Sequence, residues 1–208
     1  MIIRKLVVGA WRANCYIVGS ENTHKGLIID PGDSPDEILF AVKNSALKIE
    51  ALVATHGHID HIGAIGTLKR LLNAPVMIHK QDATALQGDG RFFWGMRFGP
   101  PMKADRLLED GERIEIEDLS FEVINTPGHT YGGICLYGHG MVFTGDTLFH
   151  RSIGSSGIGT GTREQLLDSI VDRLMVLPQE TIIYPGHGSQ TSVAEEIKSN
   201  PYIRIPRR

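Results

Sequence analysis

The chain has 208 residues, of which 41% are hydrophobic and 22% charged, and its formal net charge is -3. This composition is typical of a globular protein, and no run of like charges indicates a nucleic acid or an anionic membrane as partner. No apolar stretch approaches the length of a transmembrane helix, and the apolar run after Lys5 stops at Arg12, too short for a signal peptide. Cys15 and Cys135 lie in apolar runs, which favours buried thiols over a disulfide. We expect one domain over residues 1–208, located in the cytoplasm.

In the first half of the chain, strand-like runs alternate with two helical segments. Ser34 is placed to cap a helix that has Pro35 at its first position. The apolar residues of 62–72 fall on one face of a second helix, and the apolar run 51–54 is typical of a buried strand. The predicted elements are strands at 2–8, 14–19, 25–30, 51–54 and 76–79 and helices at 35–45 and 62–72.

Segment 87–105 interrupts this pattern. It is rich in Gly, Pro and aromatic residues and shows no alternation, which predicts a loop or a short helix. Two interpretations stay open. The segment either covers the substrate, with Arg91, Trp94 and Arg97 in contact with it, or packs as an apolar plug beneath the loop.

Regular structure resumes after this segment. Thr162, with Gln165 three residues later, forms a capping-box pattern for a helix that we expect to reach Leu177. The Gly- and Ser-rich residues 152–161 before it predict a long loop. The remaining predicted elements are strands at 106–108, 113–116, 121–124, 133–137, 141–144 and 181–184 and a final helix at 192–199.

The chemistry concentrates directly after strand 51–54. Three imidazoles and a carboxylate fall within residues 56–61, and these are ligand types that suit zinc and its first-row neighbours. His56 and His58 can reach one ion together, while Asp60 and His61 lie one step further round the turn and can reach a second. A solvent-exposed polar turn is the alternative, which we disfavour because the chain has only nine histidines.

The motif T-H-x-H-x-D-H at 55–61 resembles the signature of the metallo-β-lactamase fold superfamily. Three later loops, 126–130, 144–149 and 184–188, resemble the loops that supply further ligands in that family, and they come in the family's order. The resemblance implies an α/β fold, the four-layer αβ/βα sandwich in which two sheets face each other with helices outside.

The same resemblance implies a ligand set. One metal ion would be held by His56, His58 and His129 and a second by Asp60, His61 and His187, with Asp146 bridging the two. The expected cofactors are two zinc ions, with iron or manganese as alternatives.

Details of the ligand set resemble the glyoxalase II-like hydrolases more than other branches. The resemblance implies hydrolysis of a small-molecule thioester, such as an acyl-glutathione, by a metal-bridging hydroxide that the catalytic residue Asp60 orients. A lactonase of the same fold is one alternative. Another is a persulfide dioxygenase-like oxidoreductase with one iron at His56, His129 and Asp146.

Two departures from the glyoxalase II pattern bear on the substrate. The chain ends soon after His187, without the helical domain that helps full-length glyoxalase II enzymes to bind glutathione. Ser155 and Gly157 stand where such relatives usually have Arg and Asp. The hydrolase class is therefore better supported than specificity for glutathione thioesters.

Overall fold

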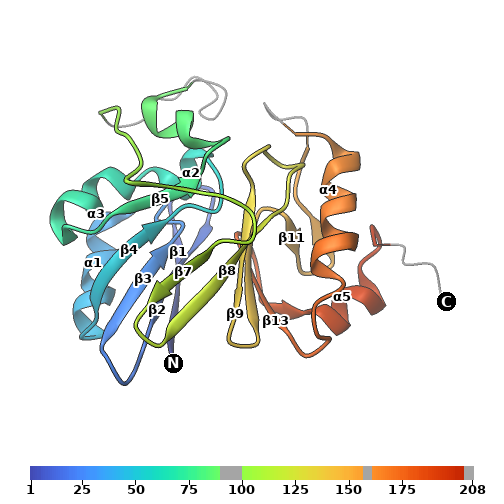
Figure 1. Cartoon of the computed structure of the whole chain (residues 1–208), viewed down its shortest axis with the longest axis horizontal. Coiled ribbons are helices and arrows are strands. Elements are labelled where there is room, and N and C mark those ends of the chain that lie inside the picture. The colour runs from blue at the N-terminus through green and yellow to red at the C-terminus, as the bar shows by residue number, and fades with distance from the viewer. Residues whose placement is uncertain (90–99, 157–160, 204–208) are drawn as a thin grey trace.

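The computed structural model describes residues 1–89, 100–156 and 161–203. Two sheets of six strands each face one another, and helices cover the outer face of each sheet (Figure 1). This arrangement confirms the expected α/β sandwich. Arg91, Trp94, Arg97 and Gly157, which the sequence analysis singled out, lie outside the described residues.

The first sheet comes from the first half of the chain. Its first three strands pair antiparallel and the remaining pairs are parallel, so the carboxyl ends of the third to sixth strands meet at one edge. In spatial order the strands are β1 (Ile2–Val8), β2 (Ala13–Gly19), β3 (Lys25–Ile29), β4 (Lys48–Val53), β5 (Val76–His79) and β6 (Arg106–Leu108). The helices of this half are α1 (Pro35–Asn44), α2 (Ile59–Ile62), α3 (Ile65–Leu72) and the 3-10 helix η1 (Ala83–Gln87).

The second sheet comes from the second half. Among the described strands of this sheet only β10 and β13 pair in parallel, and the ends of these two strands lie at the same edge as those of the first sheet. The strands are β14 (Thr191–Ser192), β13 (Ile182–Pro185), β10 (Met141–Gly145), β9 (Ile134–Gly138), β8 (Leu119–Asn125) and β7 (Arg113–Ile116) in spatial order. The other elements are the small pair β11 (Leu148–Phe149) and β12 (Ser152–Ile153), α4 (Arg163–Ser169), the π-helix η3 (Ile170–Leu174) and α5 (Val193–Ser199).

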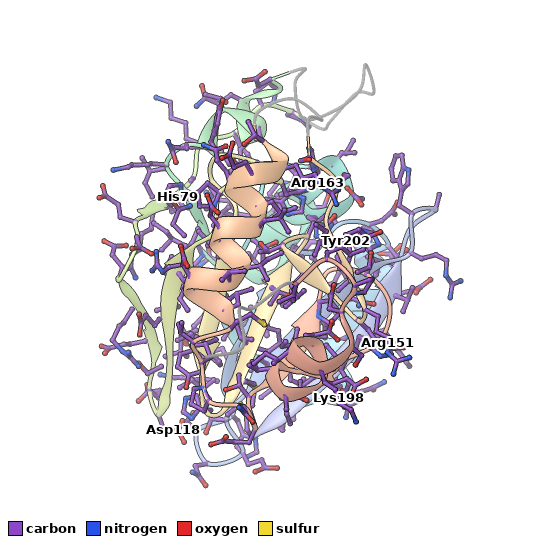
Figure 2. All side chains as sticks on the ribbon, turned by 90° about the vertical axis from the view of Figure 1, so that its right-hand side faces the viewer. His79, Asp118, Arg151, Arg163, Lys198 and Tyr202 are labelled. Atoms are coloured by element: carbon purple, nitrogen blue, oxygen red, sulfur yellow. The ribbon has the colours of Figure 1, made fainter. Side chains whose placement is uncertain are left out.

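The core between the sheets is apolar and aromatic. Tyr16 of β2 packs edge-on against Phe143 of β10, with ring centroids 5.2 Å apart. The Tyr16 hydroxyl donates to the carbonyl of Pro185 at 2.7 Å, so the ring also supports the turn that follows β13. On the far side, Arg163 at the start of α4 lies 5.3 Å from the ring centre of Tyr202, which holds residues near 202 against that helix (Figure 2).

The predicted helix over 62–72 is wrong as one continuous element. The amide of Ala64 donates to the carbonyl of Pro31 rather than continuing a helical ladder, and this bond separates α2 from α3. A Cβ at Gly63 would lie 2.3 Å from the carbonyl oxygen of Gly32, so the close approach of the two loops requires glycine there. As a result, Asp60 and His61 lie in a short helix of their own.

Three smaller predictions also meet the structure. Ser34 stands at the N-cap position of α1 with Pro35 first in the helix, as predicted, but its φ is 52° and its side chain makes no capping hydrogen bond. The capping box of Thr162 and Gln165 is confirmed. Within the predicted loop 152–161, Ser152–Ile153 instead pairs with β11.

Both cysteines are buried free thiols, as predicted. No helix among the described residues has the length and apolar character needed to cross a membrane.

Candidate metal centre

Four loops, from both sheets, deliver polar side chains to the same edge of the sandwich. They follow β4, β8, β10 and β13, and they carry the motif residues 55–61, 126–130, 146 and 187. Because a strand fixes the position of its last residue, the loop that follows it starts from a rigid support. The structure therefore brings together side chains that are up to 131 residues apart, from His56 to His187.

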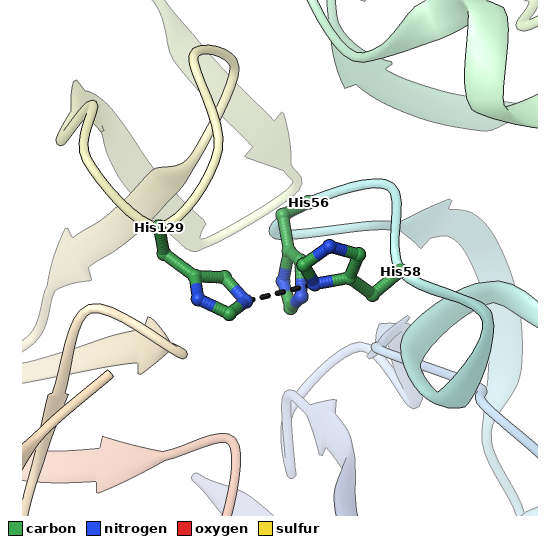
Figure 3. A group of neighbouring side chains, drawn as sticks. All are labelled: His56, His58 and His129. Atoms are coloured by element: carbon green, nitrogen blue, oxygen red, sulfur yellow. Dashed lines mark hydrogen bonds between the residues drawn. The ribbon is translucent and has the colours of Figure 1, made fainter. Parts of the chain in front are cut away.

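The first group of side chains is His56, His58 and His129. Their nearest ring nitrogens lie within 4.8 Å of one another, and all three residues are buried. Nδ1 of His58 and Nε2 of His129 are 2.8 Å apart (Figure 3). The grouping is the one that the sequence predicted for one ion.

The second group is Asp60, His61 and His187, whose ligand atoms also lie within 4.8 Å of one another. The Oδ2 atom of Asp60 is 3.6 Å from Nε2 of His61 and 3.3 Å from Nε2 of His187. Of the His187 side chain 28% is exposed, whereas that of His61 is fully buried. This group is therefore the more open of the two.

Asp146 touches both groups. Its Oδ1 lies 3.3 Å from Nε2 of His61, and its Oδ2 lies 3.6 Å from Nε2 of both His129 and His187. A single carboxylate with its two oxygens directed in this way can serve two ions at once.

The chemistry of these side chains fits divalent metal ions. Nε2 of His56, Nε2 of His61 and Oδ1 of Asp146 are buried and have no hydrogen bond within the described residues. A buried polar atom left in that condition costs about 1–3 kcal/mol. Imidazole nitrogen and carboxylate oxygen are also donors that zinc and related ions bind, so the His and Asp clusters indicate a binuclear site for divalent ions.

The two groups differ in charge. Burial lowers the pKa of His56 well below its usual value, and burial followed by the neighbouring His129 lowers the pKa of His58 to about 4. Burial acts in the same direction on His61, but the charges of Asp146 and Asp30 outweigh it and raise the His61 pKa. His56 and His58 are therefore held as neutral imidazoles, the form that binds a metal ion.

Asp30 is a functional residue that the sequence reasoning missed. Its buried carboxylate accepts hydrogen bonds from the amide and hydroxyl of Thr55, both at 2.7 Å, and lies 2.9 Å from Nδ1 of His61. With Nδ1 of His61 donating to Asp30, Nε2 keeps its lone pair for the site. The signal was present in the sequence, because Asp30 directly follows β3, which pairs in parallel with β4.

His129 is oriented by a backbone group instead. Its Nδ1 donates to the carbonyl oxygen of Ser155 at 2.6 Å, which leaves Nε2 directed toward Asp146. The Ser155 side chain therefore takes no part in this bond. The replacement of the usual Arg at this position leaves the support of His129 intact.

Asp82, also missed by the sequence reasoning, ties the two halves of the site together. It is fully buried, and its two oxygens accept from the amide of Gly57 at 2.9 Å and from the amide of Gly132 at 2.8 Å. Burial raises the pKa of Asp82. Asp82 belongs to no recognisable motif, so only the fold reveals that it joins a loop from one sheet to a loop from the other.

Asn14 of β2 holds the loop that carries His187 in place. The Asn14 amide donates to the carbonyl oxygen of Gly186 at 2.7 Å, and the Asn14 side chain donates to Pro185 and Gly188 at 2.8 and 3.0 Å. A Cβ at Gly186 would lie 2.3 Å from Oδ1 of Asp146. Glycine is therefore required where the loop passes close to the Asp146 side chain.

Comparison with known proteins agrees with this geometry. The family model described as the metallo-beta-lactamase superfamily matches residues 8–187. The chain is 33% identical to a probable metallo-hydrolase, YqgX of Bacillus subtilis, over 96% of each chain. It is 32% identical to the hydroxyacylglutathione hydrolase GloC of Haemophilus influenzae, over 98% of each chain.

Solved structures show the same fold over nearly the whole chain. The B3 metallo-beta-lactamase BLEG-1 is 30% identical, with a TM-score of 0.91 over 97% of this chain and 99% of that one. TTHA1623 in a di-iron-bound form is 33% identical, with a TM-score of 0.86 over 96% and 100% of the two chains. ETHE1 from Myxococcus xanthus is 32% identical, with a TM-score of 0.82 over 97% and 84%.

Proposed function

We infer from these matches that the chain, which belongs to the metallo-β-lactamase superfamily, is a metal-dependent hydrolase. We propose that its substrate is a small thioester, such as an acyl-glutathione, and that it acts in the cytoplasm. In this proposal His56, His58 and His129 hold one ion, and Asp60, His61 and His187 hold the other. Asp146, which lies between the two groups, would serve as a ligand to both ions. Zinc is the proposed metal, with iron or manganese as alternatives, since TTHA1623 has a di-iron-bound form.

The observation that carries the proposal is the position of Asp146 between two separate groups of ligand atoms. Structural zinc is usually saturated by four protein ligands, whereas seven side chains shared by two ions leave positions open for water and substrate. Two divalent ions bound there would act as Lewis acids and would bring the pKa of water toward neutrality.

Asp60 is the proposed catalytic residue. Its side chain is 11% exposed, so it lies at the open side of the centre. Burial opposes ionisation of Asp60, but a hydrogen bond from His187 and the charge of His61 outweigh it and lower the Asp60 pKa. An ionised carboxylate held in this way accepts a hydrogen bond from the attacking water and directs it toward the carbonyl carbon of the substrate.

A thioester fits the site for chemical reasons as well. A thiolate leaves without strong assistance from an acid, so the chain need not supply a proton donor for that step. The similarity to the hydroxyacylglutathione hydrolase of Haemophilus influenzae, over nearly the full length, supports the same class of substrate. Ser155 and Gly157 differ from the residues usual in such relatives, so hydrolysis of a thioester bond is better supported than the identity of the thiol.

The test is a substrate panel on protein loaded with zinc, iron or manganese. We expect hydrolysis of S-lactoylglutathione, measured as the release of the free thiol, and a much lower rate on simple lactones of similar size. Hydrolysis of lactones alone would support the lactonase alternative and contradict our proposal, as would a fully loaded protein that cleaves no thioester.

One observation favours a second candidate, a persulfide dioxygenase that uses iron. This chain is 32% identical to ETHE1, a persulfide dioxygenase, and the match covers 97% of this chain. This candidate needs only His56, His129 and Asp146 around one iron. Oxygen consumption by the iron-loaded protein with glutathione persulfide, unaffected by loss of His187, would support it over the hydrolase.

A further inference from the structure

A recess of about 350 Å³ opens beside His187, on the side of the more open ligand group. Its walls include Lys5 of β1, Trp11 and Arg12 of the turn between β1 and β2, and Asn14 of β2. The volume falls within the range of about 300–1,000 Å³ that is usual for small-molecule sites. Because His187 belongs both to this recess and to the metal centre, a molecule bound in the recess reaches the centre directly.

The wall of the recess is rigid where it meets the metal centre. The Asn14 side chain donates to the carbonyls of Pro185 and Gly188, which holds the turn around His187 in place. Nζ of Lys5 donates to the Gly188 carbonyl as well, at 3.1 Å. This bond keeps the Lys5 ammonium at the rim of the recess rather than extended into solvent.

The recess has a positive charge. Lys5 and Arg12 are its charged lining residues, and no acidic residue lines it within the described part of the chain. Arg12 is exposed and makes no ion pair with any described residue, so its guanidinium remains available to an anion. Trp11 lies beside it with 46% of its surface exposed.

We propose that this recess binds the negatively charged end of the leaving thiol, with Arg12 as the main anion-binding residue and Lys5 in support. The inference rests on the proposed thioester hydrolysis. In this arrangement the thioester carbonyl lies at the metal centre, and the thiol half extends past His187 along Trp11. The anion is a carboxylate if the thiol is a peptide such as glutathione, and a phosphate if it is coenzyme A.

Two single substitutions, one in the turn after β1 and one in β1, separate this role from a general effect of lost positive charge. Arg12→Gln removes the charge from the recess. Arg4→Gln removes the same charge from β1, but Arg4 lies on the other side of the strand, beside Leu6 and Phe40 in a different surface depression. Arg4→Gln is therefore the matched control.

The assay compares lactoyl thioesters of three thiols, namely glutathione, coenzyme A and the neutral N-acetylcysteamine, on metal-loaded protein. For Arg12→Gln we expect the ratio of kcat/KM for an anionic substrate to kcat/KM for the neutral one to fall about 10-fold, the size of one lost charge-assisted contact. The fall should shrink at high salt, because Arg12 is exposed. Arg4→Gln should leave the ratio unchanged.

The outcomes are distinct. A fall in the ratio with the glutathione ester identifies a carboxylate, and a fall only with the coenzyme A ester identifies a phosphate. An equal effect of both variants, or no change in the ratio for Arg12→Gln, would overturn the inference. If the wild type cleaves no thioester at all, the proposed function fails.

Binding can be tested separately from turnover. The chain has two tryptophans, so a Trp94→Phe background leaves Trp11 as the fluorescent reporter. Titration with S-methylglutathione, a thioether that cannot be hydrolysed, should change Trp11 emission, and Arg12→Gln should weaken the binding while Arg4→Gln does not. No change in emission, together with no heat of binding by calorimetry for either S-methylglutathione or S-methyl-coenzyme A, would also overturn the inference.

Discussion

The two halves of the metal centre use similar side chains in different surroundings. His56 and His58 are each 1% exposed, and burial holds both in the neutral form. In the other half, 28% of the His187 side chain is exposed, and the side chain lines a recess at the protein surface. His187 also has a raised pKa because the hydrogen bond with Asp60 and the charge of Asp146 outweigh its partial burial.

The comparison separates two tasks. A group that is closed on all sides can hold an ion, but it offers little access to a substrate. A group that combines an anionic side chain with an open face can bind an ion and also receive water and the substrate. We therefore place the entry of the substrate on the side of Asp60 and His187.

The largest expected effect is that of Asp60→Asn. The substitution is nearly isosteric, but it removes an anionic ligand and the group that directs the attacking water. Steady-state kinetics on S-lactoylglutathione should show kcat reduced by orders of magnitude, while circular dichroism shows an unchanged fold. Near-normal kcat in this variant would remove Asp60 from the mechanism.

A smaller effect is expected from Asp30→Asn, because Asp30 acts on the centre through His61. Loss of such a supporting carboxylate commonly weakens metal binding about 10–100-fold, and competition with a chelator would measure it. Ser155→Ala is the matched control, since His129 is supported by the backbone carbonyl of Ser155 and not by its side chain. Equal metal affinities for the two variants would show that the bond from His61 to Asp30 is dispensable.

The smallest effect concerns the pH dependence of the metal-free protein. The His58 pKa of about 4 in the folded chain lies below the value of about 6.5 for an unfolded chain, so the unfolded state takes up a proton first as pH falls. His58 therefore lowers the free energy of unfolding progressively between about pH 6.5 and pH 4. The pKa of His187 is raised, so its stabilising contribution is fully present below pH 6.5 and is lost as pH rises through its folded pKa.

Thermal unfolding in the presence of a chelator would detect these opposite signs. His58→Gln should flatten the decline in stability between pH 6.5 and pH 4. His187→Gln should lower the free energy of unfolding most at the acid end of that range. Identical pH profiles for the two variants would contradict the difference in charge between the two groups.

Much of the fold was predictable because its strands are short apolar runs separated by clear turn signals. Residues 2–8, 76–79, 106–108 and 113–116 have the bounds that the sequence predicted. The break between α2 and α3 was not predictable from periodicity, since it depends on a hydrogen bond from Ala64 to Pro31, in a loop more than thirty residues earlier. Gly63 was the available local signal.

The candidate site divides in the same way. The side chains of the four motifs come together as predicted, because each motif directly follows a strand. Asp30 acts through bonds to Thr55 and His61, which form once β3 and β4 pair, and Asp82 joins Gly57 to Gly132 once the two sheets are assembled. Such supporting residues follow from topology and not from local pattern.

The most direct test of the binuclear centre is the metal content of the protein, measured by elemental analysis after loading and removal of excess ions. We predict two ions per chain for the wild type and one for His187→Ala, because that variant opens the exposed group and leaves His56, His58 and His129 in place. One ion per wild-type chain, with no further loss in His187→Ala, would contradict the account.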